Sequence, residues 1–284
     1  MQQNLKSGML YIVGTPIGNL EDMTFRAVRI LQEADIIAAE DTRHTGRLLH
    51  HFQIKTPQIS YHEHNGYQRL PELIDKLLEG KIIALVTDAG MPGISDPGYE
   101  LVKACADANI TTIPIPGPCA GIVALSASGL PTDRFVFEGF LAVKGKERQR
   151  SLAALQSESR TMILYESPHR LRQTLQDLGI FLGMDREVVL ARELTKLYEE
   201  FWRGTFGDAI AHYTTREPQG EFTIVVAGVS AAVPMLSEEA IKAELQELID
   251  RGVTRSQASR QLAEQTSLPR RQIYQIALTI LDRE

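Results

Sequence analysis

Cysteine is scarce in this chain, and Cys105 and Cys119 are the only two among 284 residues. Both lie in segments typical of buried structure, so we predict neither a disulfide framework nor a cysteine-based zinc site. Long apolar runs are also lacking, because no stretch approaches the roughly 20 residues that a membrane-spanning helix needs. The apolar run at 9–13 is too short for the core of a signal peptide. We therefore expect a cytoplasmic protein without a membrane partner.

Basic charge is in the minority, with 30 Lys and Arg against 36 Asp and Glu and a net charge of −6. A protein of this charge can meet RNA only through a local basic surface. Hydrophobic residues make up 43% of the chain, which is enough for a sizeable core and argues against general disorder. The length predicts about two domains.

The usual phosphate-binding motifs are missing. The glycines of VGTPIGN at 13–19 are spaced as G-x-x-x-G, which is not the dinucleotide fingerprint, and no Walker-type motif occurs. We expect Asn19 to cap the helix that follows and Glu21 and Asp22 to lie in its first turn. Carboxylates at the positive end of a helix dipole repel a phosphate. The ligand is therefore expected to be neutral or cationic, which disfavours a nucleotide-dependent dehydrogenase.

Short apolar runs alternate with amphipathic segments through the first part of the chain. This alternation predicts a mostly parallel α/β sheet, which binds ligands beyond the carboxyl ends of its strands. The predicted strands are 9–13, 35–40, 81–86 and 110–117, and the predicted helices are 20–34, 70–80 and 99–108.

A loop rich in glycine and proline, VTDAGMPGISDPG at 86–98, follows one of these strands. So rigid a loop is expected to let a ligand approach the backbone closely. Asp88 stands at its start. Asp96 followed by Pro97 is the usual sequence of an N-cap and a first helical residue, so we assign Asp96 to capping and not to catalysis.

A second α/β unit with a mixed sheet is predicted after the linker at 129–134, because its strand-like segments follow one another more closely. Another boundary is expected at 230–239, and a helical tail from Ile241 resembles a helix-turn-helix. The predicted domains are an N-terminal α/β domain at 1–117, a C-terminal α/β domain at 118–232 that completes a ligand cleft, and a helical extension at 233–284.

Eight segments in collinear order resemble the bacterial ribosomal RNA small-subunit methyltransferase I family, which belongs to the tetrapyrrole-methylase superfamily. They are YIVGTPIGNLEDMTFRAVRIL, AAEDTRHTGRLL, LVTDAGMPGISDPG, PGPCAGIVALSASGLP, FEGFL, LYESPHRL, ARELTKLYEE and GEFTIVVAG. The resemblance covers about residues 9 to 229, and the helical tail resembles that family's C-terminal extension. It implies two α/β domains with S-adenosylmethionine bound between them, a homodimer, and 2′-O-methylation of a cytidine ribose in small-subunit rRNA.

The resemblance also implies which residues bind the cofactor. They are Asp88, Ala89, Gly90, Met91, Ile94, Gly117, Ala120, Tyr165, Glu166, Ala191, Arg192, Gly220, Glu221 and Phe222. Alternative interpretations remain open: a turn-forming role for Asp88, core packing for Tyr165 and hairpin closure for Gly220. No metal is expected, since His62 and His64 are not completed to a known ligand pattern by a carboxylate or cysteine.

Methyl transfer to a ribose hydroxyl needs in-line positioning and removal of a proton. The candidate residues at the expected cleft are Glu40, Asp41, Arg43, Asp88, Glu166, Glu193 and Lys196. We expect Arg43 and Lys196 to orient the RNA. Glu40, Asp88 or Glu166 is expected to accept the proton, and the sequence does not choose among them.

Three basic segments are predicted to bind RNA. Arg43, Arg47 and His51 share one stripe if their segment is helical. KGKERQR at 144–150 has four basic residues, and 251–271 has five arginines, whereas 237–250 has five acids. The predicted RNA-binding residues are Arg43, Arg47, Lys144, Lys146, Arg148, Arg255, Arg260, Arg270 and Arg271. Solvated helix faces, or a helical hairpin that supports a dimer, are the alternative interpretations.

Two other functions remain open at this point. One is a small-molecule methylase of the tetrapyrrole type with the same fold, which has no need of the basic segments. The other is a non-catalytic ribosome-binding factor, which binds the cofactor without transferring its methyl group.

Overall fold

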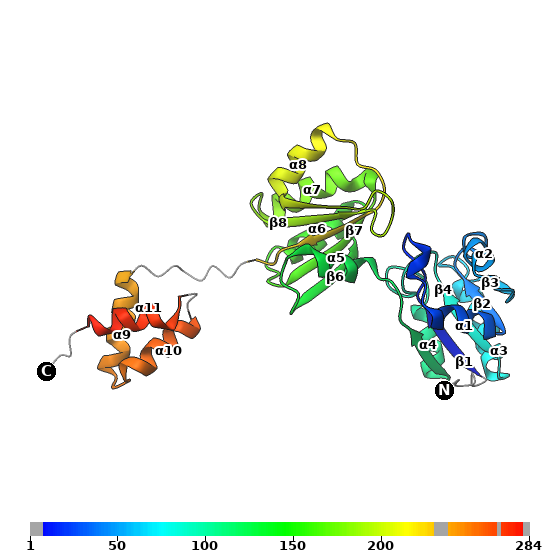
Figure 1. The fold of residues 1–284 in the computed structure, drawn as a ribbon, viewed down its shortest axis with the longest axis horizontal. Coiled ribbons are helices and arrows are strands. Elements are labelled where there is room, and N and C mark those ends of the chain that lie inside the picture. Colours follow the sequence, from blue (N-terminus) through cyan, green and yellow to red (C-terminus); the bar gives the residue numbers. More distant parts are fainter. Residues whose placement is uncertain (1–7, 230–237, 266–267, 281–284) are drawn as a thin grey trace. The chain divides into compact units, whose positions relative to one another are not determined.

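The computed structural model describes residues 8–229, 238–265 and 268–280 of the chain. Contacts between residues divide the chain into two compact units, Met1–Gly228 and Val229–Glu284. The described residues of the first unit form two five-stranded sheets, and those of the second form three helices (Figure 1). In the described residues, no helix is long and apolar enough to cross a membrane.

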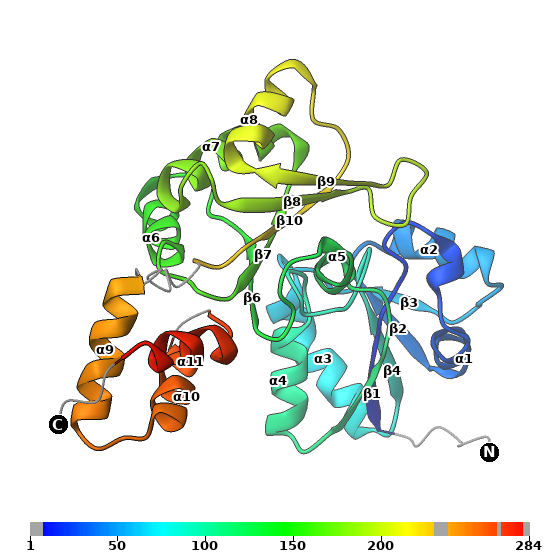
Figure 2. The same cartoon turned by 60° about the vertical axis from the view of Figure 1, so that its left-hand side comes forward.

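The first sheet is parallel throughout, as predicted, with the strand order β3-β2-β4-β1-β5. Its strands are β1 (Met9–Val13), β2 (Ile36–Ala39), β3 (Gln58–Ser60), β4 (Ile82–Val86) and β5 (Thr111–Ile115). Alternate residues of β1 face two separate cores, since Tyr11 packs with Ile30 and Leu31 whereas Leu10 packs with Leu73. Helices therefore cover both faces (Figure 2). They are α1 (Phe25–Glu33), α2 (Thr42–His51), α3 (Gly66–Leu78) and α4 (Tyr99–Asp107).

The helix expected at 20–34 is interrupted. A single 3-10 turn, η1 (Leu20–Asp22), is capped by the Asn19 side chain, and α1 begins only at Phe25 behind its own cap, Thr24. Between them Met23 is extended and packs into the core. Glu21 and Asp22 therefore do not lie in the first turn of α1. Asn19 does cap a helical turn that contains Glu21 and Asp22, as predicted, but this turn ends at Met23, so the prediction of one helix over 20–34 was wrong.

The second sheet is mixed, as predicted, with the order β6-β7-β10-β8-β9, and only β6 and β7 pair in parallel. Its strands are β6 (Phe135–Phe140), β7 (Thr161–Glu166), β8 (Glu187–Arg192), β9 (Glu200–Thr205) and β10 (Phe222–Val226). Met162 and Leu164 of β7 face the larger core, built with α6 (Gly145–Leu155), α7 (Pro168–Leu182) and α8 (Phe206–Thr215). Ile163 faces α5 (Ala120–Ser128) on the opposite side.

The second unit is helical, as predicted for the tail. Where the structure describes it, this unit contains α9 (Glu238–Asp250), α10 (Arg255–Gln265) and α11 (Arg270–Leu278). Ile241, Leu245, Leu262 and Ile273 form a core of its own. The boundary expected at 230–239 lies mostly outside the described residues, as does the limit between the predicted domains at 232 and 233.

Candidate active site

A cavity of about 440 Å³ lies beyond the carboxyl ends of β1, β4 and β5. Loops from the first sheet form one wall, and β7, β8 and β10 of the second sheet contribute the other. Its size falls within the range of roughly 300–1,000 Å³ that is usual for small-molecule sites. The lining residues are Ile17, Ala89, Gly90, Met91, Ile94, Ser95, Asp96, Cys119, Ala120, Phe140, Tyr165, Glu166, Ser167, Pro168, Ala191, Leu194, Glu221, Phe222 and Thr223.

Most of the residues proposed for the cofactor line this cavity. Those that do are Ala89, Gly90, Met91, Ile94, Ala120, Tyr165, Glu166, Ala191, Glu221 and Phe222. Asp88, Gly117, Arg192 and Gly220 lie outside the lining. Some lining residues were not predicted to bind the cofactor although they lie inside the motifs that carry the family resemblance. Ser95 and Asp96 belong to LVTDAGMPGISDPG, and Cys119 belongs to PGPCAGIVALSASGLP. Phe140 belongs to FEGFL, another segment that carries the family resemblance, and this membership was the sequence signal that could have identified it.

The glycines of the first sheet let its loops pack on one another. Thr15 and Gly90 exchange two backbone hydrogen bonds of 2.9 and 3.0 Å. Gly90 has a φ of +82°, which favours glycine. A Cβ on Gly14 would lie 2.6 Å from the Met91 sulfur and 2.7 Å from Gly117 Cα. Close approach of three loops therefore explains the glycines at positions 14 and 117.

Asp96 is not the N-cap of α4, so its assignment to capping was wrong. The N-cap is Gly98, with a φ of +144° and no side-chain cap, and the helix begins at Tyr99. Asp96 instead lines the cavity. Burial raises its pKa to about 7, the negative charges of Glu40 and Asp88 add to this, and the Thr87 hydroxyl opposes it more weakly than burial does.

Glu40 and Asp88 join the carboxyl ends of β2 and β4. The Asp88 N–H donates to Glu40 Oε2 at 3.2 Å, and the Asp41 N–H donates to Asp88 Oδ1 at 3.2 Å. Burial raises the pKa of Glu40, and the hydrogen bond from the Asp88 N–H partly offsets this. Glu40 and Asp88 thus form an acidic pair that acts on Asp96, the one of these three carboxylates that lines the cavity.

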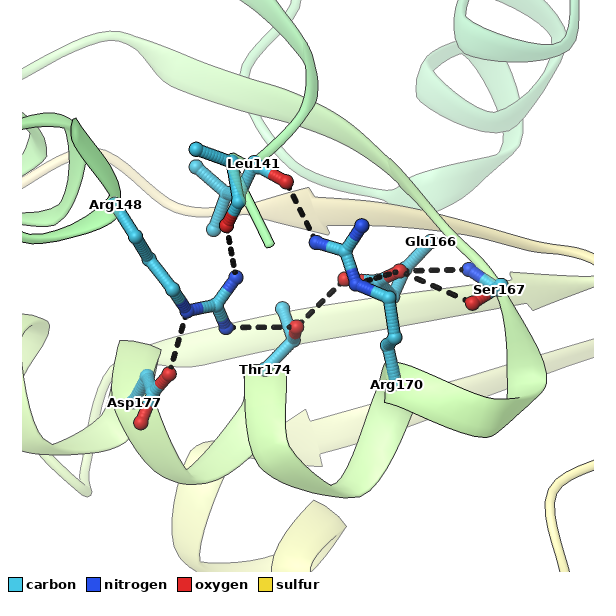
Figure 3. A network of polar contacts seen from close by, with 8 residues as sticks. Leu141, Arg148, Glu166, Ser167, Arg170, Thr174 and Asp177 are labelled. Carbon is cyan, nitrogen blue, oxygen red and sulfur yellow. Dashed lines mark hydrogen bonds and ion pairs between the residues drawn. The ribbon is translucent and has the colours of Figure 1, made fainter. Parts of the chain in front are cut away.

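Glu166 is held in a buried polar network (Figure 3). Its side chain is 1% exposed, and Oε1 accepts from the Ser167 N–H at 2.8 Å and forms an ion pair with Arg170 at 3.3 Å. Oε2 accepts from the Thr174 hydroxyl at 2.6 Å. Both oxygens are therefore engaged within the protein, which leaves Glu166 poorly placed to accept a substrate proton.

Arg148 belongs to the same network and not to an RNA-facing surface. Its side chain is 7% exposed and donates to Asp177 at 2.8 Å, to the Ala142 carbonyl at 3.0 Å and to the Thr174 hydroxyl at 3.0 Å (Figure 3). The expectation that Arg148 contacts phosphate conflicts with this burial. A sequence signal existed, because Arg148, Leu152 and Leu155 share one helix face and all three are buried.

Lys196 lies between two carboxylates in the loop that joins β8 and β9. Its ammonium group is 2.9 Å from both Glu193 and Glu221. Burial lowers the pKa of Lys196, but the hydrogen bonds to these carboxylates outweigh it and raise the pKa overall. Glu193 and Thr195 both have positive φ, and a Cβ on Gly18 would clash with the Lys196 side chain. The β1 loop therefore packs closely against this strained loop.

The other residues outside the cavity lining have structural partners. Arg192 donates to the Gln219 carbonyl at 2.6 Å, and a Cβ on Gly220 would lie 2.5 Å from the Glu193 carboxylate carbon. Arg43, with a side chain that is 88% exposed, forms an ion pair with Asp41 at 2.9 Å and lowers the pKa of that carboxyl.

The basic residues elsewhere are mostly exposed. The segment with Arg43, Arg47 and His51 is helical, which the prediction of a shared stripe required, and Arg47 is exposed. Lys144 and Lys146 are exposed at the start of α6. In the second unit the exposed arginines include Arg260, Arg270 and Arg271. Arg255 donates to the Ile280 carbonyl at 2.8 Å. Within the residues that the structure describes, no group of three or more His, Cys, Asp or Glu side chains is arranged to hold a metal ion.

Comparison with known proteins identifies the family. The model of the Tetrapyrrole (Corrin/Porphyrin) Methylases matches residues 9–210. The ribosomal RNA small subunit methyltransferase I of Synechocystis sp. is 62% identical over 96% of this chain and 98% of its own length. The protein of that name from Halalkalibacterium halodurans is 49% identical over 97% of this chain and 96% of its own length. The one from Escherichia coli O157:H7 is 51% identical over 83% of each chain.

Solved structures share the fold. A uroporphyrin-III-C-methyltransferase from Thermus thermophilus superimposes with a TM-score of 0.56 at 23% identity, over 78% of this chain and 94% of that one. A cobalt precorrin-4 methyltransferase gives 0.56 at 19% identity, over 78% and 95%. The chain therefore belongs to the tetrapyrrole methylase family and, within it, to the ribosomal RNA small subunit methyltransferase I group.

Proposed function

We propose that this chain transfers a methyl group from S-adenosylmethionine to small-subunit ribosomal RNA, and that the acceptor is the 2′-hydroxyl of a cytidine ribose. The observation that carries the rRNA substrate is the 62% identity, over nearly the full length of both chains, to a protein named for this activity. The cytidine 2′-hydroxyl rests on the sequence resemblance alone.

The cavity suits a cationic cofactor without phosphates. Among the described residues, no lysine or arginine lines it, whereas Asp96, Glu166 and Glu221 do. A pyrophosphate would meet negative charge there, and a sulfonium would not. We place the adenine beside Phe222 and Ala191 and the methionine part beside the loop after β4. The cofactor would supply a methyl group on a positively charged sulfur.

Exposed basic side chains supply the phosphate contacts in this proposal. The first unit contributes Arg43 and Arg47 on α2, Lys144 at the N-cap of α6 and Lys146 in its first turn. The second unit contributes Arg260, Arg270 and Arg271. Lysine and arginine contacts of this kind give salt-dependent affinity for a nucleic acid. Arg255 contributes less directly, because its guanidinium already binds the Ile280 carbonyl.

A homodimer in the cytoplasm is part of the proposal. Phe135 and Phe137 on the edge strand β6 are 39% and 36% exposed, and Ile122 on α5 is 49% exposed. Exposed apolar side chains gathered on neighbouring elements are typical of protein interfaces. A second copy of this chain is the partner that the family resemblance implies.

Transfer of a tritiated methyl group to small ribosomal subunits that lack the modification tests the function. We expect label in the rRNA at the 2′-hydroxyl of a single cytidine, located by mapping the modified ribose. Label on a base would support rRNA as the substrate but contradict the ribose hydroxyl as the acceptor. Cofactor binding without any transfer would favour a non-catalytic ribosome-binding factor.

A small-molecule methylase is the second candidate, because two tetrapyrrole methyltransferases share the fold. A parallel assay with a uroporphyrinogen acceptor distinguishes it. Transfer to the tetrapyrrole and not to the subunits would overturn the proposal.

A further inference from the structure

We propose that Asp96 is the catalytic base that removes the proton from the acceptor hydroxyl, an inference that rests on the proposed function. Asp96 lies in the lining of the cavity, on the loop between β4 and α4. The sequence pattern predicts a helix N-cap at this residue, but the N-cap of α4 is Gly98, so the Asp96 side chain does not cap the helix.

The other carboxylates of the lining are committed to partners. Among the described residues, three carboxylates line the cavity: Asp96, Glu166 and Glu221. Glu166 is fully engaged by the network around Thr174 and Arg170. Glu221 forms an ion pair with Lys196 at 2.9 Å, and its side chain is 79% exposed. A substrate hydroxyl would have to displace a protein partner to reach either carboxylate, so neither is well placed to accept its proton.

The surroundings of Asp96 favour a base that works near neutral pH. The charged groups that face it are Glu40 at the end of β2 and Asp88 at the end of β4, and Tyr165 faces it from β7. With burial, the two carboxylates raise its pKa to about 7. A catalytic base is most effective when its pKa lies near the working pH.

The loop holds Asp96 in a fixed position. The Gly93 N–H donates to the Pro97 carbonyl at 3.1 Å, which closes the loop around Asp96. Ser95, directly before it, has a φ of +60°, a conformation that costs energy for a residue other than glycine. Backbone strain of this kind is concentrated at functional sites. A fixed position matters for a base, because proton transfer requires a separation of roughly 2.6–3.2 Å between the two heavy atoms.

In the reaction, the ribose 2′-oxygen forms a bond to the methyl carbon as the bond between that carbon and sulfur breaks. The electron pair of the broken bond remains on sulfur, which becomes a neutral thioether. The hydroxyl proton passes to the Asp96 carboxylate and leaves to solvent after the product dissociates. Charge and atoms balance without a metal or a further reactant.

Asp96→Asn is the direct test, because it keeps the size of the side chain and removes the base. We expect kcat for methylation of small subunits to fall about 10²- to 10⁴-fold. We expect the dissociation constant of S-adenosylmethionine, measured by calorimetry, to change by no more than a few-fold. A loss of cofactor binding that accounts for the whole loss of activity would overturn the proposal in favour of a cofactor-binding role.

The pH profile gives a readout that a structural role would not change. For the wild type, kcat/KM should rise with pH and level off above an apparent pKa near 7, since only the ionised carboxylate accepts a proton. Glu40→Gln removes one of the charges that raise the pKa of Asp96, so the rising limb should move to lower pH. An unmoved limb in Glu40→Gln, or an unchanged kcat in Asp96→Asn, would overturn the proposal.

Titration of Asp96 itself separates this inference from the proposed function. In protein labelled with carbon-13 at the aspartate carboxyls, one resonance should titrate near pH 7 and be missing from Asp96→Asn. If that resonance titrates only below pH 5, the base assignment fails even if the rRNA is methylated. If the wild type methylates no rRNA, the proposed function fails, whatever Asp96 does.

Discussion

Thr174 donates its hydroxyl proton to Glu166 at 2.6 Å and accepts a hydrogen bond from Arg148 at 3.0 Å. One hydroxyl thus joins a buried carboxylate at the end of β7 to a buried guanidinium on α6 (Figure 3). Tyr165, Glu166 and Ser167 line the cavity at this point. The network therefore fixes one wall of the active site from behind.

Replacement of Thr174 by Val should destabilise the protein by about 1–3 kcal/mol, because it leaves a buried acceptor on Glu166 and a buried donor on Arg148 unpaired. Valine has nearly the same shape, so little packing is lost. Urea unfolding followed by circular dichroism measures the change. Thr132→Val, at an exposed position, is the matched control and should stay within about 0.5 kcal/mol. Equal effects in both variants would show that the network contributes nothing.

Replacement of Gly14 by Ala should weaken cofactor binding, because the new methyl group would lie 2.6 Å from the Met91 sulfur and 2.7 Å from Gly117 Cα. The loops that line the cavity must then separate. We expect roughly a tenfold rise in the dissociation constant, or about 1.4 kcal/mol, measured by calorimetry.

Gly46→Ala is the control for this prediction. Gly46 lies inside α2, and its added Cβ would lie 3.6 Å from Gln58 Nε2, an ordinary contact. Alanine in a helix interior is favoured over glycine by roughly 0.5–1 kcal/mol, so cofactor binding should be unchanged and stability slightly higher. Unchanged binding in Gly14→Ala as well would show that the loops tolerate separation.

The sequence predicted the architecture because its main determinants are local. The runs at 9–13 and 82–86 are apolar at every position, which is typical of central parallel strands buried on both faces. The same reasoning placed ligand-binding loops at their carboxyl ends, where the cavity lies. The strand β3 was missed, because it has three half-buried residues and no clear periodicity.

The errors concern polar residues whose role depends on distant partners. Arg148 reads as one of four basic residues in a surface segment, but its partners Thr174 and Asp177 lie 26 and 29 residues further along. Asp96 precedes a proline, as N-caps often do, but the N-cap of α4 is Gly98, two residues later. Burial of a charge is decided by tertiary packing, which local patterns do not contain.

Charge reversal at Lys144 and Lys146 should show that these exposed lysines bind RNA, whereas the buried Arg148 does not. The double variant Lys144→Glu and Lys146→Glu is expected to bind small-subunit rRNA more weakly, with a shallower dependence of affinity on salt, because it removes phosphate contacts. Its thermal stability should be near that of the wild type, since both side chains are exposed.

Arg148→Gln is the counterpart to this double variant. Loss of the guanidinium leaves Asp177 without its buried partner, so we expect destabilisation of about 3–5 kcal/mol. Its salt dependence of RNA binding should match that of the wild type. A reduced salt slope in a folded Arg148→Gln protein would show that Arg148 contacts phosphate after all.

Asp96→Asn should stabilise the ligand-free protein, and the gain should depend on pH. The folded pKa of Asp96 is raised to about 7, whereas an unfolded aspartate titrates near 4. Between these values the folded state binds more protons than the unfolded state, so this carboxyl lowers the stability of the wild type as pH rises. Asparagine does not titrate, so the advantage of the variant should grow from pH 4 to 7 and stay constant above. Chemical denaturation at pH 4, 5.5, 7 and 8 measures it, and a variant less stable than the wild type at pH 8 would show that the ionised Asp96 supports the fold.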